Sequence, residues 1–238
     1  MIITALIPAR YGATRFPGKL LQPLGGKSVI RRTYEAARDT GLFDRLIVAT
    51  DSDEIEKEIV EAGGEVFRSK REHESGTDRI AEAAEELQTD LIINIQGDTP
   101  FIRKEPLQRL VDLFEDDRIQ VASMMQLLEK EGEIADPNFV KVATDKNSNA
   151  LFFSRSRIPF PRDPNASVTY YEHIGVYAFR KQALMDFVRW PLGYLEAIEK
   201  VECLRFLENG MPIRMLPVDY LGVEIDTPED LTKAEKLL

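Results

Sequence analysis

The amino-acid sequence predicts an α/β fold with a mostly parallel central sheet flanked by helices. Short apolar runs recur through the first hundred residues, and their length is typical of buried strands. Segments in which apolar residues have helical spacing lie between these runs, so that a helix follows a strand four times. This alternation is typical of a doubly wound sheet, because a helical crossover makes successive strands run parallel.

The first half of the chain supports this prediction element by element. Residues 28–40 have the spacing of an amphipathic helix, and Gly41 follows as a stop signal. Two further helices are predicted, the first at 54–62 before a pair of glycines and the second at 80–87. The strands predicted in this half are residues 2–7, 46–50, 66–67 and 91–95.

The second half is less regular. Residues 140–144 and 150–154 predict two strands joined by a polar turn, and residues 155–167 predict a long loop that contains three prolines. Amphipathic spacing predicts helices at 105–114 and 196–208, and a last helix follows Asp226. The other predicted strands are residues 121–127, 173–179, 213–216 and 222–225.

Length and composition limit the function classes. The 238 residues suit a single domain over 1–238, with a smaller subdomain at roughly 120–190. The net charge of −10 argues against a nucleic-acid partner, which would require a basic face. A single cysteine excludes an internal disulfide and suits a reducing cytosol. No signal peptide and no run long enough to span a bilayer are evident, so we expect a cytoplasmic protein without membrane insertion.

The loop after the first strand gathers positive charge in an acidic protein. It holds Arg10, Arg15 and Lys19, and Gly12 and Gly18 allow its backbone to bend. Because ligands collect at the carboxyl ends of parallel strands, this loop predicts a phosphate site. A solvated basic turn is the alternative interpretation.

Neither standard nucleotide motif is present. Gly25-Gly26-Lys27-Ser28 resembles the end of a P-loop, but the glycine that this motif needs earlier is replaced by Leu21. The first strand is followed by Pro-Ala-Arg, so the glycine pattern of dinucleotide-binding proteins is also missing. The sheet therefore predicts a nucleotide site of another kind.

Two carboxylates suggest a metal site. Asp98 follows one predicted strand and Asp226 follows another, so both can meet at the same edge of the sheet. Mg²⁺ prefers oxygen ligands and often takes only one or two from protein. For Asp226 the alternative is a helix N-cap, which the sequence Asp-Thr-Pro-Glu-Asp also suits, and for Asp98 it is a plain turn.

Seven segments together resemble one known family. IPARYGATRFPGK, VATD, ESGTDR, NIQGD, FSRSRIPF, HIGVY and EIDTPEDL occur in this order from one end of the chain to the other. In this they are similar to the 3-deoxy-manno-octulosonate (Kdo) cytidylyltransferases, also called CMP-Kdo synthetases. The resemblance implies a Rossmann-like nucleotidyltransferase fold with a smaller inserted subdomain. It also implies a homodimer.

The resemblance further implies an activity. It is the Mg²⁺-dependent transfer of CMP from CTP to the anomeric hydroxyl of Kdo, which releases pyrophosphate and supplies lipopolysaccharide biosynthesis. Catalytic roles then fall to Arg10, Lys19, Asp98 and Asp226, of which the two aspartates would hold the metal. The residues implied for CTP binding are Arg10, Arg15, Lys19, Ser75, Gly76, Asp78 and Arg79, and those implied for the sugar are Gln96, Arg155, His173, Tyr177 and Glu202.

The physical demands of the reaction agree with these roles. Phosphoryl transfer mainly requires positioning of the triphosphate and neutralisation of its charge. The carboxylate of a sugar acid matches a guanidinium fork, which Arg155 or Arg157 can supply. For both arginines a solvated loop is the alternative, and His173 can instead be a strand histidine that is merely hydrogen bonded.

Two positions depart from the family pattern. Thr99 stands where a glutamate is expected, and Cys203 stands where a glutamine is expected, although a thiol cannot replace an amide as a hydrogen-bond partner. Both changes lie in segments that the resemblance links to binding of the sugar and not to binding of CTP. A sister group that acts on 8-amino-3,8-dideoxy-manno-octulosonate shows similar segments, including SRSRIPF and VEIDTPED.

Three hypotheses follow from the sequence. The first is the cytidylyltransferase, with Kdo or its 8-amino analogue as acceptor. The second is a nucleotide-binding module without catalysis. The third, a nicotinamide-dependent oxidoreductase, is disfavoured by the missing glycine pattern.

Overall fold

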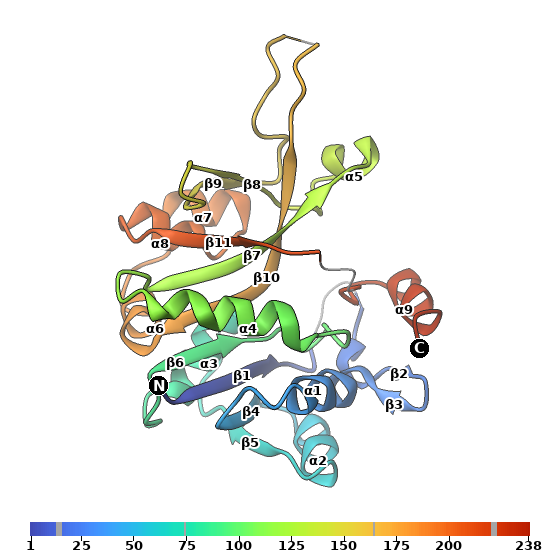
Figure 1. Ribbon diagram of the computed structural model, residues 1–238. Coiled ribbons are helices and arrows are strands. Elements are labelled where there is room, and N and C mark those ends of the chain that lie inside the picture. The colour runs from blue at the N-terminus through green and yellow to red at the C-terminus, as the bar shows by residue number, and fades with distance from the viewer. Residues whose placement is uncertain (13–15, 74, 164, 220–222) are drawn as a thin grey trace. The chain divides into compact units, whose positions relative to one another are not determined.

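The apolar runs of the first half form a sheet of order β6-β1-β4-β5, in which all neighbouring strands run parallel (Figure 1). These strands are β1 (Ile3–Ala9), β4 (Arg45–Thr50), β5 (Glu65–Arg68) and β6 (Leu91–Asn94). Leu6, Val48 and Ile93 are fully buried, as continuous apolar runs in a parallel sheet predict. The predicted α/β class is confirmed.

A helix follows each of these strands, and three of the four helices begin at serine caps. They are α1 (Val29–Asp39), α2 (Asp53–Glu61), α3 (Gly76–Ala84) and α4 (Lys104–Asp112). The hydroxyls of Ser28, Ser52 and Ser75 accept the first free backbone N–H groups of α1, α2 and α3. In Figure 1, α1 lies in front of the sheet and α3 lies behind it, so both faces are covered.

The computed structural model describes residues 1–12, 16–73, 75–163, 165–219 and 223–238. The chain divides into two compact units. Unit 1 is Met1–Gln108 with Leu221–Leu238, and unit 2 is Arg109–Tyr220. The subdomain expected at roughly 120–190 falls inside unit 2, and its limits stay a prediction.

Unit 2 is built on two long antiparallel strands, β7 (Val121–Leu128) and β10 (Tyr170–Arg180). Strand β11 (Ile213–Pro217) runs parallel to β7 on its other side. The hairpin of β8 (Lys141–Thr144) and β9 (Ala150–Ser154) pairs with β10 through β8. Between β9 and β10 the chain extends as a long arm, which agrees with the predicted loop (Figure 1).

Short elements complete the chain. In unit 1 they are η1 (Lys19–Leu21), the hairpin β2 (Pro23–Leu24) and β3 (Lys27–Ser28), and α9 (Pro228–Glu235). In unit 2 they are η2 (Leu113–Glu115), α5 (Glu131–Ala135), α6 (Lys181–Phe187), α7 (Tyr194–Glu199) and α8 (Leu204–Glu208).

Three predicted elements require correction. The helix predicted at 196–208 is wrong, because Lys200 adopts a left-handed conformation (φ 54°) that separates α7 from α8. Helix α3 begins at Gly76 and not at Ile80, because Ser75 caps it. Residues 223–225 are not a strand, and Gly222 lies outside the described residues.

Among the described residues, no helix combines the length and the apolar character that crossing a membrane requires.

Candidate active site

Three charged side chains of unit 1 meet at one point. The Lys19 ammonium group, at the start of η1, donates to Asp226 Oδ1 over 2.8 Å and also to Asp98 Oδ2. Both carboxylates therefore lie within hydrogen-bonding distance of a single nitrogen atom. The expected approach of Asp98 and Asp226 is observed.

The backbone around Asp98 explains how it reaches this point. After β6, the Thr99 N–H and hydroxyl both donate to the Gln96 carbonyl and close a tight turn. Gly97 packs within the turn, where a Cβ atom would lie 3.1 Å from the Pro8 carbonyl oxygen and 3.2 Å from Ile30 Cδ1. Only glycine fits this close approach without displacing neighbouring atoms.

Asp226 reaches the same point by a route that the sequence did not predict. The Ile225 N–H donates to the Asp98 carbonyl over 3.1 Å, which ties the two segments together directly before Asp226. Asp226 is also not the cap of α9, because the Thr227 hydroxyl accepts from the Asp230 N–H and the Asp230 carboxylate accepts from Thr227 N–H. The capping alternative is thus wrong, and the Asp226 carboxylate is directed to Lys19.

Lys19 stays positively charged in this setting. Burial alone would lower its pKa, but the charges of Asp98 and Asp226 and their hydrogen bonds outweigh burial and raise the pKa above 10.5. One ammonium group facing two carboxylates leaves an excess of negative charge at this point.

A divalent cation fits this donor set. Two carboxylates that already share one cationic group supply the hard oxygen ligands that Mg²⁺ prefers, with phosphate and water as the usual remaining ligands. The described part of the chain contains no cluster of three or more His, Cys, Asp or Glu side chains that could hold a metal without such additional ligands. Asp98 and Asp226 are therefore suited to a metal that arrives with a phosphate.

The N-terminal end of α3 lies against the ends of β1 and β6. Ser75 caps the helix, and its hydroxyl also donates to Asp78 Oδ2 over 2.8 Å. A Cβ atom at Gly76 would lie 3.3 Å from Pro8 Cγ and 3.8 Å from Gln96 Oε1. The predicted nucleotide residues Ser75, Gly76 and Asp78 are thus grouped at the strand edge that also carries Gln96.

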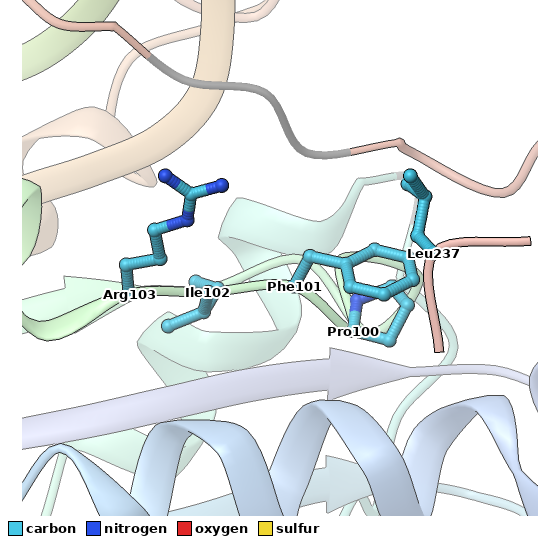
Figure 2. Close-up of a pocket in the computed structure, with 5 residues that line it drawn as sticks. All are labelled: Pro100, Phe101, Ile102, Arg103 and Leu237. Carbon is cyan, nitrogen blue, oxygen red and sulfur yellow. The ribbon is translucent and has the colours of Figure 1, made fainter.

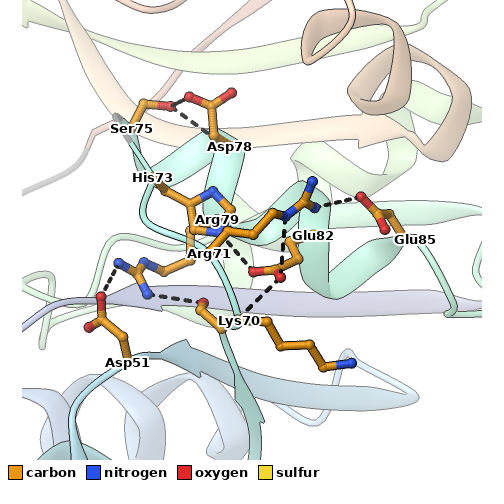
Figure 3. A network of polar contacts seen from close by, with 10 residues as sticks. Asp51, Lys70, Arg71, His73, Ser75, Asp78, Arg79, Glu82 and Glu85 are labelled. Carbon is orange, nitrogen blue, oxygen red and sulfur yellow. Dashed lines mark hydrogen bonds and ion pairs between the residues drawn. The ribbon is translucent and has the colours of Figure 1, made fainter.

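Arg79 is buried, with 5% of its surface exposed. Its guanidinium donates to Asp51 Oδ2 over 2.7 Å and to Ser69 Oγ over 3.0 Å (Figure 3). Asp51 follows β4 and Ser69 follows β5, so Arg79 joins α3 to the carboxyl ends of two strands. Its predicted contact with CTP stays a prediction.

The N-terminal loop contains two further predicted phosphate-binding cations, Arg10 and Arg15. Arg10 follows β1 and is exposed, and no ion pair or hydrogen bond joins its side chain to another described residue. Arg15 lies outside the described residues.

A shallow pocket follows directly after the Gln96–Thr99 turn. Pro100, Phe101, Ile102, Arg103 and Leu237 line it, and Figure 2 shows the Phe101 ring beside Pro100 and Leu237. Four of these five residues are apolar, and the Arg103 guanidinium extends from one end.

In unit 2, His173 and Tyr177 lie together on β10. Their rings are 5.2 Å apart, and Phe153 packs edge-on against His173 at 5.0 Å. At a bulge between Ile174 and Tyr177, the Ser123 hydroxyl lies within hydrogen-bonding distance of the Ile174 and Val176 carbonyls and 3.0 Å from His173 Nε2. Burial lowers the pKa of His173 to about 4, so this imidazole is neutral at pH 7.

The predicted sugar-binding arginine of unit 2 already has protein partners. The Arg155 guanidinium donates to the carbonyls of Glu199 (2.7 Å), Pro137 (2.9 Å) and Lys200 (3.3 Å). These bonds hold the end of β9 to the end of α7, and they use three of the five N–H groups of an arginine. In this geometry Arg155 acts as a structural clamp, that is, it links segments of unit 2 through backbone carbonyls. The contact of Arg155 with a sugar acid stays a prediction.

Arg157 and Glu202 are two further residues of unit 2 that were considered for sugar binding. Arg157 donates to the Tyr170 hydroxyl over 2.7 Å and to Glu131 Oε1 over 2.6 Å, and its guanidinium lies over the Tyr170 ring. Glu202 lies between α7 and α8 and is partly exposed. The sequence predicted Arg157 as a cation of the loop, but it did not predict that Tyr170 and Glu131 bind its guanidinium.

The two departures from the family pattern are both buried. Thr99 is fully buried and closes the turn before the pocket, and Cys203 is 1% exposed at the N-terminal end of α8. Burial raises the pKa of the Cys203 thiol far above its ordinary value, so it stays protonated. Both side chains fill space inside the protein.

Sequence reasoning missed the partners that orient several site residues. Asp51 and Ser69 hold Arg79, and Ser123 contacts His173. A serine inside the apolar strand VASMM was the available signal for Ser123, because a buried hydroxyl needs a partner. Asp51 and Ser69 gave no comparable signal, since polar residues after a strand are common in loops.

Comparison with known proteins identifies the family. A family model described as cytidylyltransferase matches residues 4–213. The chain is 56% identical to a 3-deoxy-manno-octulosonate cytidylyltransferase of Christiangramia forsetii, over 99% of this chain and 96% of that protein. It is 53% identical to a protein of the same name from Flavobacterium johnsoniae, over 100% and 99%. An 8-amino-3,8-dideoxy-manno-octulosonate cytidylyltransferase of Shewanella baltica is 42% identical, also over 100% and 99%.

Solved structures agree with this relationship. A CMP:2-keto-3-deoxy-manno-octonic acid synthetase complexed with CTP superimposes with a TM-score of 0.94 at 36% identity, over 100% of this chain and 98% of that one. A 4-diphosphocytidyl-2C-methyl-D-erythritol synthase of Anaerococcus prevotii shares the fold alone, with a TM-score of 0.68 at 15% identity, over 99% and 97%. The chain, whose converging lysine and aspartates lie at the carboxyl edge of the same kind of sheet, belongs to the 3-deoxy-manno-octulosonate cytidylyltransferase family.

Proposed function

We propose that this protein transfers CMP from CTP to the anomeric hydroxyl of Kdo, which forms CMP-Kdo and releases pyrophosphate. The observation that carries the proposal is the meeting of Lys19, Asp98 and Asp226 at one point of unit 1. The names of the relatives at 53–56% identity agree with this activity.

In the proposed reaction, the anomeric oxygen of the sugar forms a bond to the α-phosphorus of CTP. The bond from that phosphorus to the oxygen that bridges the α- and β-phosphates breaks, so that this oxygen leaves with pyrophosphate, and the hydroxyl proton leaves to water. The chain needs to bind and align these groups, because phosphoryl transfer depends mainly on positioning and charge neutralisation.

The residues of unit 1 divide this work. Lys19, with its raised pKa, and Arg10 bind phosphate oxygens, and Arg15 is proposed to do the same. Asp98 and Asp226 would hold Mg²⁺, which, when bound, neutralises phosphate charge and lowers the pKa of a hydroxyl that contacts it. For this reason the mechanism needs no dedicated histidine base.

The nucleoside and the acceptor are assigned to other residues. Ser75, Gly76, Asp78 and Arg79 are proposed to bind cytosine and ribose at the N-terminal end of α3. The proposed acceptor-binding residues are Gln96, Arg155, His173, Tyr177 and Glu202. His173 would act there as a neutral hydrogen-bonding group, because its pKa lies near 4.

The proposal includes the biological setting. We infer a homodimer in the cytoplasm that supplies lipopolysaccharide biosynthesis. The resemblance to the family and the single buried thiol, which suits a reducing compartment, support this setting. Light scattering of the purified protein measures the oligomeric state.

The test is pyrophosphate release from CTP and Mg²⁺ with a panel of acceptors: Kdo, its 8-amino analogue and a sialic acid. We expect the highest kcat/KM with Kdo. A clear preference for the 8-amino sugar would transfer the assignment to the activity named for the Shewanella baltica relative.

Two other results of the same experiment would reject catalysis. CTP binding by calorimetry without pyrophosphate release from any acceptor would indicate a binding module. Binding of NAD(H) in place of CTP would indicate an oxidoreductase.

A further inference from the structure

The carboxylate of Glu82, on α3, is the centre of a group of charged side chains that the proposed reaction does not use. Glu82 Oε2 lies 2.7 Å from His73 Nε2, and Oε1 accepts from the Lys70 N–H (3.2 Å) and from Arg71 Nε (3.4 Å) (Figure 3). All three partners belong to the loop that leads from β5 into α3. Glu82 therefore links α3 to the loop that precedes it.

The contact between His73 and Glu82 is buried. Their side chains are 7% and 6% exposed, which is unusual for a loop histidine and a helix glutamate. Burial alone would raise the pKa of Glu82, but the hydrogen bonds from His73 and the Lys70 amide outweigh it and lower the pKa below its ordinary value. Glu82 is therefore ionised at neutral pH, and loss of His73 would leave a buried charge with fewer partners.

A second α3 residue fixes the start of the same loop. Arg79 donates to Ser69 Oγ, directly after β5, and to Asp51, directly after β4 (Figure 3). Arg79 and Glu82 lie three positions apart on α3, so they project from neighbouring parts of one helix face. Between them they hold the loop at Ser69, Lys70, Arg71 and His73.

The loop ends at Ser75 and Gly76, the capped start of α3, which is called the Ser75–Gly76 turn. Ser75 and Gly76 follow His73 by two and three positions, and Gly76 lies against Pro8 and Gln96 at the ends of β1 and β6. In the sequence only Glu74, which lies outside the described residues, separates His73 from the Ser75 cap of α3. Both side chains are buried and hydrogen bonded to each other.

We propose that His73 and Glu82 are positioning residues, which set the Ser75–Gly76 turn for binding the nucleoside part of CTP. This inference rests on the proposed function, in which that turn binds cytosine and ribose. His73 touches neither CTP nor the acceptor in this account, and it acts only through the placement of the turn.

The experiment measures the Kd for CTP by calorimetry, together with kcat and both KM values, for His73→Ala, Glu82→Gln and the double variant. We expect each single change to raise the Kd and KM for CTP about tenfold or more, because displacement of a positioning group by about 1 Å is costly. The kcat at saturating CTP and the KM for the acceptor should stay near those of the unaltered protein. The double variant should lose no more affinity than either single variant, because both changes break one contact.

The matched control is Glu196→Gln in unit 2. Glu196 forms an equally buried ion pair with Arg205 (6% and 7% exposed, 2.6 and 2.7 Å), so Glu196→Gln lowers Tm by breaking a contact within unit 2. An unchanged CTP affinity in His73→Ala and Glu82→Gln, with Tm lowered as in this control, would reduce the pair to a purely structural role and overturn the inference. A fall in kcat with an unchanged KM for CTP would also overturn it, because His73 would then act in the reaction itself.

Two provisions keep the result decisive. Where His73→Ala does not fold, His73→Gln replaces it, because its amide N–H can still donate to Glu82, and CTP affinity should then be largely retained. A loss of affinity in His73→Gln as large as in Glu82→Gln would contradict the inference. Calorimetry of CTP alone also separates this inference from the proposed function, since it needs no turnover of any acceptor.

Discussion

At the level of single residues, one ammonium group organises the candidate site. Lys19 contacts two carboxylates that lie far apart in the sequence, and its raised pKa keeps it charged. The sequence predicted that these aspartates meet, because both were expected at strand ends. The meeting is observed, but the reason differs for Asp226, whose position comes from the Ile225–Asp98 backbone hydrogen bond.

The two aspartates give the first prediction. Asp98→Asn and Asp226→Asn each keep the size of the side chain but remove a negative charge that Lys19 contacts and that the proposed function assigns to Mg²⁺. We expect each variant to lose about a hundredfold or more in kcat. Steady-state pyrophosphate release over a Mg²⁺ titration measures this loss. Turnover close to that of the unaltered protein in both variants would exclude them as metal ligands.

His173 gives a prediction about pH. Its pKa in the folded protein, about 4, lies below the ordinary value of 6.5, so the unfolded chain binds this proton more readily. The contribution of His173 to stability is therefore complete above pH 6.5 and is lost as pH falls toward 4. We expect the difference in Tm between the unaltered protein and His173→Gln to shift against the unaltered protein over this range. A difference that does not change with pH would show that His173 titrates normally.

Sequence patterns could identify which residue types matter, but not their partners. Arg79 and Arg155 were both assigned to ligands, and the structure gives their guanidinium groups to Asp51, Ser69 and backbone carbonyls. Such partners depend on the packing of distant segments, which periodicity does not encode. The same limit applies to His73, which a local pattern marks only as a loop residue.

At the level of elements, serine caps fix where α1, α2 and α3 begin. The start of α3 was predicted too late, because the apolar spacing begins at Ile80 while the Ser75 hydroxyl already accepts the Asp78 N–H. The helix predicted at 196–208 failed for the opposite reason. Its apolar spacing continues through Lys200, although the backbone there turns left-handed and ends α7.

The cap of α3 is testable by comparison with that of α1. Ser75→Ala and Ser28→Ala each remove a hydroxyl that accepts a helix N–H, and each should cost about 1 kcal/mol of stability. Only Ser75→Ala should also raise the KM for CTP, because Gly76 lies beside Pro8 and Gln96 at the candidate site. Chemical denaturation and steady-state kinetics measure the two effects. Equal KM values in both variants would separate the α3 cap from nucleotide binding.

The end of β9 gives a second prediction at this level. Arg155→Ala removes three hydrogen bonds to backbone carbonyls, so we expect a loss of about 1–3 kcal/mol in the free energy of unfolding. The proposed function adds that the KM for the sugar acid rises far more than the KM for CTP. A lower stability with an unchanged KM for the sugar would leave Arg155 as a clamp only.

At the level of the whole molecule, the parallel sheet of unit 1 was the most predictable part. Its strands are short, apolar and separated by well-capped helices, so local signals agree with the fold. Unit 2 was less predictable, because its short helices α5 and α6 lack a long apolar period and its arm lacks regular structure. The activity and the roles of the site residues were predicted from the family resemblance, because periodicity carries no information on either.

The central claim is that this chain joins CMP to Kdo. Mass spectrometry of the products formed from CTP, Kdo and Mg²⁺ tests it most directly. We predict one new species with the mass of CMP and Kdo joined with loss of water, together with one pyrophosphate for each molecule formed. Complete recovery of unreacted CTP and Kdo from a folded protein that binds CTP would contradict the account.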